Sequence, residues 1–354
     1  MILTVSWKPT GHGMIRLSSM MKKMTGMMKK RTKMMNLTLK KTKWNGDPAA
    51  DRDKFIGGSD IGTILGMNPW KSAYTLWAEK SGLIEAPDIS DKEAVWWGNY
   101  DEEGVAKRFC EKTGKKVRRS LMSYYTEEYP FIAGHVDRLV VGEEAGLECK
   151  TTSSFNKTDF ESGEVPPMHW AQCQLYMFVT GCQYWYYAVK RDNREFYYCR
   201  VDRAEAWIEG TMLPAAIDFW RHIQNNEPVE VDGSDSTADT LTQLYPGDTS
   251  QKAQNTVLML PKEMADKLSM ADEIAATAKK LKEQADEIKN SVKAEMKDHQ
   301  KATAGIYSVT WARGQRTDLD KERLKKERPD IYEHYSITKP YERFSYRKMK
   351  EAKK

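Results

Sequence analysis

The order of strand-like and helix-like patterns between Phe131 and Asn225 constrains the fold more than any other feature of the sequence. Apolar, aromatic and β-branched residues mark two strands, a helix, two further strands and an amphipathic helix: residues 131–141, 145–153, 168–181, 184–192, 194–202 and 203–225. The third and fourth strands meet at Asp192–Asn193, which is typical of a hairpin. Strands mixed with helices in this way predict an α/β fold with a mixed β-sheet flanked by helices.

Two helices are indicated ahead of the first strand. A Gly57–Gly58 turn precedes a short helix, where Ser59 or Asp60 is placed to cap the amino end. A second helix covers about 101–113 and is stopped by Gly114.

The two ends of the chain differ from the centre in charge. Residues 1–45 contain 11 Lys and Arg, no Asp or Glu, and nine of the 19 methionines. We expect this Met-rich tail to be disordered, either as a basic arm that binds phosphates or as an extension without function. Residues 301–354 contain 15 Lys and Arg against 8 Asp and Glu, a net charge of +7. Because the whole chain has a net charge of +5, residues 46–300 carry a net charge of −13. If this acidic centre binds nucleic acid, local positive patches or metal ions must offset its carboxylates.

The C-terminal third is expected to be a helical extension. A long helix over residues 261–300 has apolar residues at alternating spacings of four and three, a coiled-coil-like seam suited to packing on the body or on a sister helix. A strand at 305–314 and a basic helix at 320–335 follow. The expected divisions are a tail at 1–45, a folded domain at 46–230, a linker with one short helix at 231–260, and a helical and basic region at 261–354.

Several classes of protein are disfavoured. The five cysteines are odd in number and none has C-x-x-C spacing, so we expect free thiols in a reducing cytosol rather than a zinc site or disulfides. No stretch reaches the ~20 apolar residues needed to cross a bilayer. We also expect no signal peptide, because the basic start has no apolar core.

The residues suited to chemistry are concentrated in the sequence GHVDRLVVGEEAGLECK. Asp137 lies on the first strand, and Glu148 and Lys150 lie on the second. Because side chains alternate along a strand, Glu148 and Lys150 share one face, and a tight turn brings Asp137 beside them. Two carboxylates and an ammonium on a dry sheet face are costly unless they are paired.

A divalent cation would resolve that cost. Mg²⁺ prefers oxygen ligands and keeps several waters, so Asp137, Glu148 and the backbone carbonyl of Cys149 are candidate ligands. A bound ion makes a water more acidic, and Lys150 could orient or deprotonate this water, its own pKa lowered by burial but opposed by the carboxylates. This arrangement suits attack of water on a phosphodiester. A surface salt bridge on a hairpin would give the same spacing.

The chain resembles the YqaJ-like viral recombinases, relatives of phage lambda exonuclease in the PD-(D/E)xK nuclease superfamily. The resemblance covers residues 50–225 and rests on separated motifs in the same order: IGGSDIGTILGMNPW, GNYDEEG, the D…ExK residues and HWAQCQ. Residues 305–335 also look like the C-terminal part of longer members. The resemblance implies a restriction-endonuclease-like sheet.

The resemblance assigns roles to individual residues. Ser59 and Arg52 match positions that contact the DNA 5′-phosphate, although a helix cap and a surface charge are the simpler interpretations. Glu102 matches the acidic residue near the metals, because Gly98 aligns with the family glycine four residues earlier; the neighbouring Glu103 is its competitor.

The HWAQCQ motif gives one further match, and two positions of the chain depart from the family pattern. Gln172 matches the active-site glutamine that holds the attacking water or a phosphate oxygen, with Gln174 as a near neighbour. His169 stands where lambda exonuclease has tyrosine, and Val136 replaces the proline before the first acid. Because the acids and the lysine are intact, we expect an active enzyme.

The function implied by the resemblance is a deoxyribonuclease that uses Mg²⁺, with Mn²⁺ as a substitute and two ions in the site. It would digest linear double-stranded DNA from a 5′ end for recombination, in the cytoplasm of a bacterial host as a phage or prophage protein. A trimeric ring and a single-strand annealing partner are expected by analogy, and Lys325 and Lys326 could bind DNA or that partner or form a solvated face. The alternatives are a non-catalytic DNA-end-binding adaptor and an endonuclease.

Overall fold

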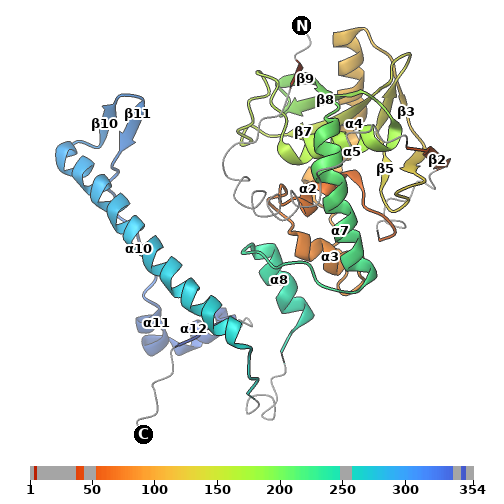
Figure 1. Ribbon diagram of the computed structural model, residues 1–354. Coiled ribbons are helices and arrows are strands. Elements are labelled where there is room, and N and C mark those ends of the chain that lie inside the picture. The colour runs from red at the N-terminus through yellow and green to blue at the C-terminus, as the bar shows by residue number, and fades with distance from the viewer. Residues whose placement is uncertain (1–3, 6–36, 44–52, 248–256, 338–343, 348–354) are drawn as a thin grey trace. The chain divides into compact units, whose positions relative to one another are not determined.

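The computed structural model describes residues 4–5, 37–43, 53–247, 257–337 and 344–347 of the chain (Figure 1). The chain divides into two compact units, residues 1–254 and 255–354. The boundary between them falls inside the polar stretch expected to be a linker, and the first unit contains the residues expected in the active site.

A six-stranded sheet forms the centre of the first unit, in the order β1-β9-β8-β7-β6-β3. The strands and the two helices that cover them are β1 (Thr4–Val5), β3 (Val117–Arg119), β6 (Arg138–Val140), β7 (Ala145–Thr152), β8 (Tyr184–Arg191), β9 (Glu195–Asp202), α4 (Glu93–Thr113) and α5 (Pro167–Thr180). β7 and β8 run parallel, which the crossover through α5 allows, whereas β7 pairs antiparallel with β6 and β8 pairs antiparallel with β9. The mixed sheet confirms the expected α/β fold class.

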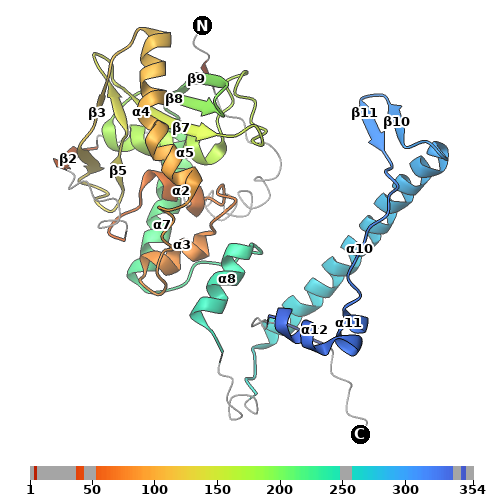
Figure 2. The same cartoon turned by 180° about the vertical axis from the view of Figure 1, so that it is seen from behind.

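Helices cover both faces of this sheet, α4 on one side and α5 on the other (Figures 1 and 2). Phe109 of α4 belongs to a buried cluster with Leu147 and Cys149 of β7. Because side chains alternate along a strand, Glu148 and Lys150 face α5. The expected common face of these two residues is therefore the α5 face.

The local signals for helix ends and for the hairpin are confirmed. α4 and α5 end at Gly114 (φ 72°) and Gly181 (φ 77°), which adopt the left-handed conformation that other residues rarely take. α4 begins at Glu93, earlier than expected, so the whole GNYDEEG motif is helical. The β8–β9 hairpin turns at Asp192, whose φ is 48°.

A smaller antiparallel sheet consists of β2 (Leu39–Lys43), β4 (Met122–Thr126) and β5 (Ala133–His135). The expectation of a disordered tail over residues 1–45 is wrong for β1 and β2, because both complete the hydrogen bonds of a sheet edge. Apart from Leu37 and Thr38, the rest of that tail lies outside the described residues.

Shorter helices complete the first unit: α2 (Gly58–Ile64), α3 (Ala73–Lys80), α6 (Glu205–Trp207), the π-helical turn η1 (Ile208–Met212), α7 (Leu213–Gln224) and α8 (Asp235–Leu244). The helix expected at 203–225 is thus present but interrupted by η1. α8 is the short helix expected in the polar stretch, and it packs on α3 through Thr240 and Thr75, whose hydroxyl oxygens are 2.8 Å apart. This part of the expected linker belongs to the folded unit.

The second unit contains α10 (Lys262–Met296), β10 (Lys301–Ala304), β11 (Tyr307–Thr310), α11 (Lys321–Glu327) and α12 (Pro329–Tyr335). α10 confirms the expected long helix, and its seam residues Leu281 and Ile288 are exposed. The strand expected at 305–314 is half of the β10–β11 hairpin. The basic helix expected at 320–335 is broken before Pro329, because proline has no backbone N–H to continue it.

The cysteines serve as small core residues of the first unit: Cys149, Cys173, Cys182 and Cys199 are buried free thiols and Cys110 is a partly exposed one. Across the described ranges, no helix has both the length and the apolar character that a membrane span requires.

Candidate active site

Asp137 lies where the chain passes from one sheet to the other. The single strand expected at 131–141 is wrong, because β5 pairs with β4 in the small sheet whereas β6 pairs with β3 and β7 in the large one. The strand is interrupted between them at Val136–Asp137. The Asp137 Oδ2 atom accepts a hydrogen bond from the backbone nitrogen of Cys149 at 3.3 Å, which fixes this carboxylate against β7.

Glu148 and Lys150 form an ion pair on the α5 face of β7. The Glu148 side chain is only 1% exposed, whereas the Lys150 side chain is 28% exposed. Oε2 of Glu148 accepts no hydrogen bond from the residues that the structure describes. A buried carboxylate oxygen without a donor is costly, so this atom marks a position where an added cation would stabilise the protein.

The charges in this cluster perturb one another. Burial, followed by the negative charge of Glu148, raises the pKa of Asp137 to about 8, although Lys150 opposes the shift. Burial lowers the pKa of Lys150, but Glu148 and Asp137 outweigh it and leave the pKa above its ordinary value. Of the two opposing influences expected on Lys150, the carboxylates prevail, and Lys150 is a cation in the metal-free protein.

α5 places Gln172 on the same side of the sheet. This residue is 8% exposed, and its Nε2 donates a hydrogen bond to Tyr176 Oη at 2.9 Å. Burial, then the charges of Glu148 and Asp137, raise the pKa of the Tyr176 hydroxyl. The Gln172–Tyr176 pair therefore lies within the electric field of the two carboxylates.

Two neighbours on α5 have different surroundings. Gln174 is fully buried and donates to the backbone carbonyl of Asp202 at 2.9 Å, so it joins α5 to the end of β9 and not to the site. His169 Nδ1 lies 2.9 Å from Tyr187 Oη. Burial and the charge of Lys150 lower the pKa of His169 to about 3, which keeps this ring neutral.

Glu102 and Glu103 both bind Arg138, a residue that the sequence did not single out although it directly follows Asp137. Arg138 Nη1 lies 2.6 Å from Glu102 Oε1, and Nη2 lies 2.8 Å from Glu103 Oε2. The Arg138 side chain is 3% exposed, the Glu102 side chain 23% and the Glu103 side chain 78%. Glu102 is thus the inner carboxylate, and its charge contributes to the raised pKa of Asp137.

Of the two residues expected at the DNA 5′-phosphate, the structure describes only Ser59. Ser59 is exposed at the start of α2, and Arg52 lies outside the described residues. Asp60, not Ser59, caps α2, because its Oδ2 accepts the backbone N–H of the N-cap glycine at 2.8 Å. α2 packs closely on α5, since a Cβ on Gly58 would lie 2.6 Å from the Tyr176 ring.

The oxygen donors fit a hard divalent cation such as Mg²⁺, which proteins bind through one or two carboxylates. The N–H of Cys149 points toward Asp137. The C=O of Cys149 faces the same edge of β7, because the N–H and C=O of one strand residue point to the same side. In the described part of the chain, no three or more Asp, Glu, His or Cys side chains are arranged to hold an ion. Asp137 and Glu148 are brought together as candidate ligands, whereas Glu102 is held by Arg138.

Comparison with known proteins shows the family. The YqaJ-like viral recombinase domain matches residues 49–183. The chain is also 32% identical over 317 residues to the uncharacterized protein YqaJ of Bacillus subtilis, which covers 89% of this chain and 96% of that protein. The chain therefore belongs to the YqaJ-like viral recombinase family, and the resemblance found in the sequence is confirmed.

Other similarities are shorter or more distant. A protein of African swine fever virus is 36% identical over 67 residues, 18% of this chain and 19% of the viral protein. An alkaline exonuclease from Laribacter hongkongensis matches with a TM-score of 0.43 and 19% identity, over 50% of this chain and 91% of that one. A phage-related exonuclease from Haemophilus somnus matches with a TM-score of 0.38 and 14% identity, over 49% of this chain and 96% of that one. Both structural similarities are confined to about half of the chain.

Proposed function

We propose that the protein is a metal-dependent deoxyribonuclease that hydrolyses phosphodiester bonds at Asp137, Glu148 and Lys150. The observation that carries the proposal is the Glu148 carboxylate, which is 1% exposed and has an oxygen without a hydrogen-bond donor among the described residues. A surface salt bridge, the simpler interpretation of the spacing, would leave both partners in solvent. A carboxylate buried beside a second one is instead suited to an ion that neutralises both.

Each residue of the cluster has a distinct role in this proposal. Asp137, Glu148 and the carbonyl of Cys149 would hold Mg²⁺, for which Mn²⁺ would substitute. When bound, two such ions would stabilise the charge on the attacking and leaving oxygens. The Lys150 ammonium would orient the attacking water, and the Gln172 amide would hold that water or a phosphate oxygen. Glu102 would assist the second ion once its pair with Arg138 loosens.

An exposed aromatic cluster supports DNA as the substrate. Trp96 and Tyr100 of α4 stack with ring centroids 5.2 Å apart, and Trp97 packs edge-on against both. The three residues are 50%, 66% and 49% exposed, in the order Trp96, Tyr100, Trp97. A Cβ on Gly98 would lie 3.6 Å from Thr151 Oγ1, so this turn of α4 lies against the end of β7. Exposed aromatic rings of this kind suit unpaired bases, which stack on such rings.

The finer parts of the proposal rest on family membership. The enzyme would digest one strand of linear double-stranded DNA from the 5′ end, with Ser59 and Arg52 at the terminal phosphate. The product, a 3′ overhang, would be the substrate of a single-strand annealing partner in the cytoplasm of the bacterial host. We propose a trimeric ring as the assembly, and the basic α11 residues Lys325 and Lys326 as a contact for DNA or for that partner.

One assay separates the possible activities. The full chain is incubated with linear and with closed circular duplex DNA in Mg²⁺, and again with excess chelator. Loss of linear DNA alone, dependent on the ion, supports the exonuclease. Cutting of circles indicates an endonuclease, and absence of cleavage by protein with a cooperative melting transition indicates a non-catalytic adaptor that binds DNA ends. End-labelled substrates then report which strand end is released first.

A further inference from the structure

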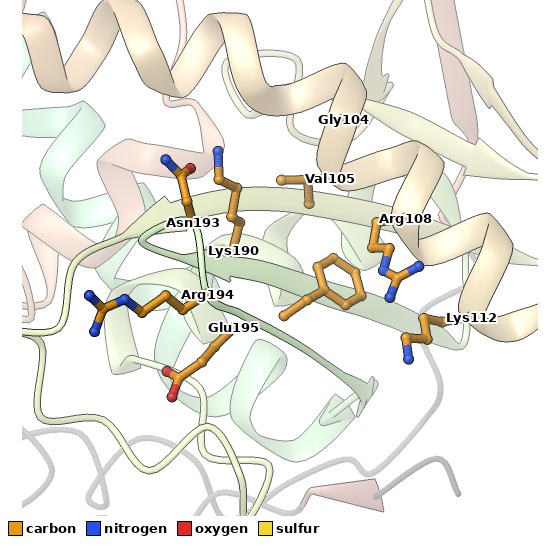
Figure 3. Close-up of a pocket in the computed structure, with 9 residues that line it drawn as sticks. Gly104, Val105, Arg108, Lys112, Lys190, Asn193, Arg194 and Glu195 are labelled. Carbon is orange, nitrogen blue, oxygen red and sulfur yellow. The ribbon is translucent and has the colours of Figure 1, made fainter.

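A hollow of about 430 Å³ lies on the α4 face of the large sheet, opposite to the face that carries Glu148 and Lys150. One wall is the C-terminal half of α4 and the other is the turn of the β8–β9 hairpin (Figure 3). The side chains that give it its character are Arg108, Lys112, Lys190, Asn193, Arg194 and Phe196. A basic hollow is unexpected here, because residues 46–300 together carry a net charge of −13.

Two of these cations have no acidic partner among the residues that the structure describes. Arg108 pairs with Glu111 at 3.0 Å, and Lys190 pairs with Asp101 at 2.6 Å. The acidic lining residue Glu195 is bound by Arg191 at 2.5 Å and so contributes little net charge. Lys112 and Arg194, by contrast, form no ion pair with any residue in the described ranges. They lie on opposite walls of the hollow (Figure 3).

The lining of the hollow also includes apolar residues suited to contact with a base. Val105 is buried, Phe196 is half-buried, and Gly104 leaves the helix backbone without a side chain at the rim. Cations together with an aromatic residue in one lining match single-stranded nucleic acid, whose phosphates meet the charges while a base contacts the ring. A duplex fits this pattern less well, because its bases are already stacked on one another.

The hollow and the candidate active site are built on the same elements of the fold. Asp101, the partner of Lys190, directly precedes Glu102 on α4. The hairpin turn is tied to the end of β7, since the Asp192 backbone nitrogen donates to the Thr152 carbonyl at 2.9 Å. Arg108 is six residues beyond Glu102, or roughly 9 Å along the helix axis at 1.5 Å per residue. The hollow and the candidate active site therefore share α4 and the end of β7, although they lie on opposite faces of the sheet.

We infer that this hollow is a second phosphate-binding site, which holds the backbone of a single DNA strand on the face of the sheet opposite to the candidate active site. Lys112 and Arg194 bind phosphates, and Phe196 supports a base. The inference rests on the proposed DNA substrate but assigns residues that take no part in the proposed hydrolysis.

The test compares two double variants in a binding assay. Lys112→Gln with Arg194→Gln removes the two cations that form no ion pair within the described ranges. Lys107→Gln with Lys116→Gln removes two lysines of the same region that do not line the hollow. Fluorescence anisotropy measures the affinity for a labelled single-stranded oligonucleotide in chelator, between ~0.05 and ~0.3 M salt, where counterion release dominates the salt dependence. Melting curves verify that both variants fold. A third variant, Lys112→Arg with Arg194→Lys, keeps both positive charges and should bind the oligonucleotide like wild type.

The expected result is specific to the hollow. Loss of two phosphate contacts should reduce the slope of log affinity against log salt by about 1.4 and weaken binding about 25-fold at ~0.1 M salt, whereas the control stays close to wild type. Equal losses in both variants, or no loss in either, would overturn the inference. The inference would also be overturned if the wild-type protein bound no single-stranded DNA. The same holds if the substitutions changed only the binding of dAMP or inorganic phosphate and not that of the oligonucleotide.

A separate cleavage measurement distinguishes this inference from the proposed function. If the wild-type protein cuts no DNA in Mg²⁺ while the hollow variant still loses affinity, the nuclease proposal is overturned and the phosphate-binding site stands. If the wild-type protein cuts DNA and the hollow variant binds a single strand like the control, the nuclease proposal stands and the hollow is not a strand site.

Discussion

Arg138 Nη1 lies 2.6 Å from Glu102 Oε1, which joins β6 to α4 one residue after Asp137. The guanidinium is almost completely buried and is shared with the outer carboxylate of Glu103. Arg138 therefore balances part of the negative charge behind the candidate active site. Glu102 is oriented by this arginine, and under the proposed function this pair would have to open before Glu102 could assist a cation.

This geometry predicts different effects for two adjacent substitutions. Glu102→Gln should lower the free energy of unfolding by about 1–3 kcal/mol, because the buried Arg138 loses its inner charged partner. It should also reduce cleavage at least tenfold. Glu103→Gln should change both by little, since exposed ion pairs contribute about 0–1 kcal/mol. Urea denaturation in chelator and cleavage in Mg²⁺ measure the two effects, and a larger loss for Glu103→Gln would reverse the assignment.

Lys150→Ala should abolish most of the cleavage while leaving DNA binding largely intact. Positioned groups of this kind contribute about 10²–10⁴-fold to proton-transfer chemistry, so we expect a loss of that order. Lys107→Ala on the exposed side of α4 is the matched control and should cleave like wild type. Because Lys150 also pairs with the buried Glu148, thermal melting must accompany the assay. Normal cleavage by Lys150→Ala would show that another group orients the water.

The pKa of Asp137 predicts how the stability of the metal-free protein depends on pH. Its folded pKa is raised to about 8, so between about pH 4 and pH 8 the folded state binds more protons at this site than the unfolded state. Stability should therefore fall as the pH rises through this window. Asp137→Asn should flatten the dependence. Melting temperatures in chelator at a series of pH values provide the measurement, and a wild-type protein that gains stability up to pH 8 would contradict it.

Mg²⁺ should stabilise the folded chain through the same carboxylates. At 100 times its dissociation constant, an ion that binds only the folded state adds about 2.7 kcal/mol. We expect the melting temperature to rise with Mg²⁺ or Mn²⁺ in the wild-type protein, and this rise to be lost in Glu148→Gln. Glu103→Gln serves as a control that also removes one carboxylate. An unchanged rise in Glu148→Gln would place the ion elsewhere.

The exposed aromatic cluster on α4 should contribute to binding of unpaired DNA. Replacing both Trp96 and Tyr100 by alanine should weaken single-strand binding, since each stacked base contributes about 1–3 kcal/mol. Trp70→Ala, which removes a 77% exposed ring outside the cluster, should not. Anisotropy with a labelled single strand compares the variants. Equal affinities would show that the stacked rings serve a purpose other than DNA contact.

Much of the local structure could be predicted from short stretches of sequence. The turn at Asp192, the ends of α4 and α5 at Gly114 and Gly181, and the shared face of Glu148 and Lys150 all follow from residues within a few positions of each other. Backbone conformation and side-chain alternation are local properties, so a single sequence contains the information needed.

The expectations that failed depend on partners distant in the chain. The strand at 131–141 divides because β5 and β6 find different neighbours, and Leu39–Lys43 becomes a strand because β4, about 80 residues away, offers an open edge. Neither event has a signature in the residues concerned. The same holds for Arg138, whose acidic partners lie more than thirty residues earlier on α4.

From its residues alone, this chain shows its family, its α/β character and the acids and lysine suited to phosphodiester chemistry. The folded arrangement adds the placement of Asp137 at the junction of two sheets and the basic hollow between α4 and the β8–β9 turn. It also buries Glu148 with one oxygen that has no donor among the described residues. The physical reason is that charge, burial and cavity shape are set by contacts between segments far apart in sequence, whereas residue chemistry and periodicity are written along the chain itself.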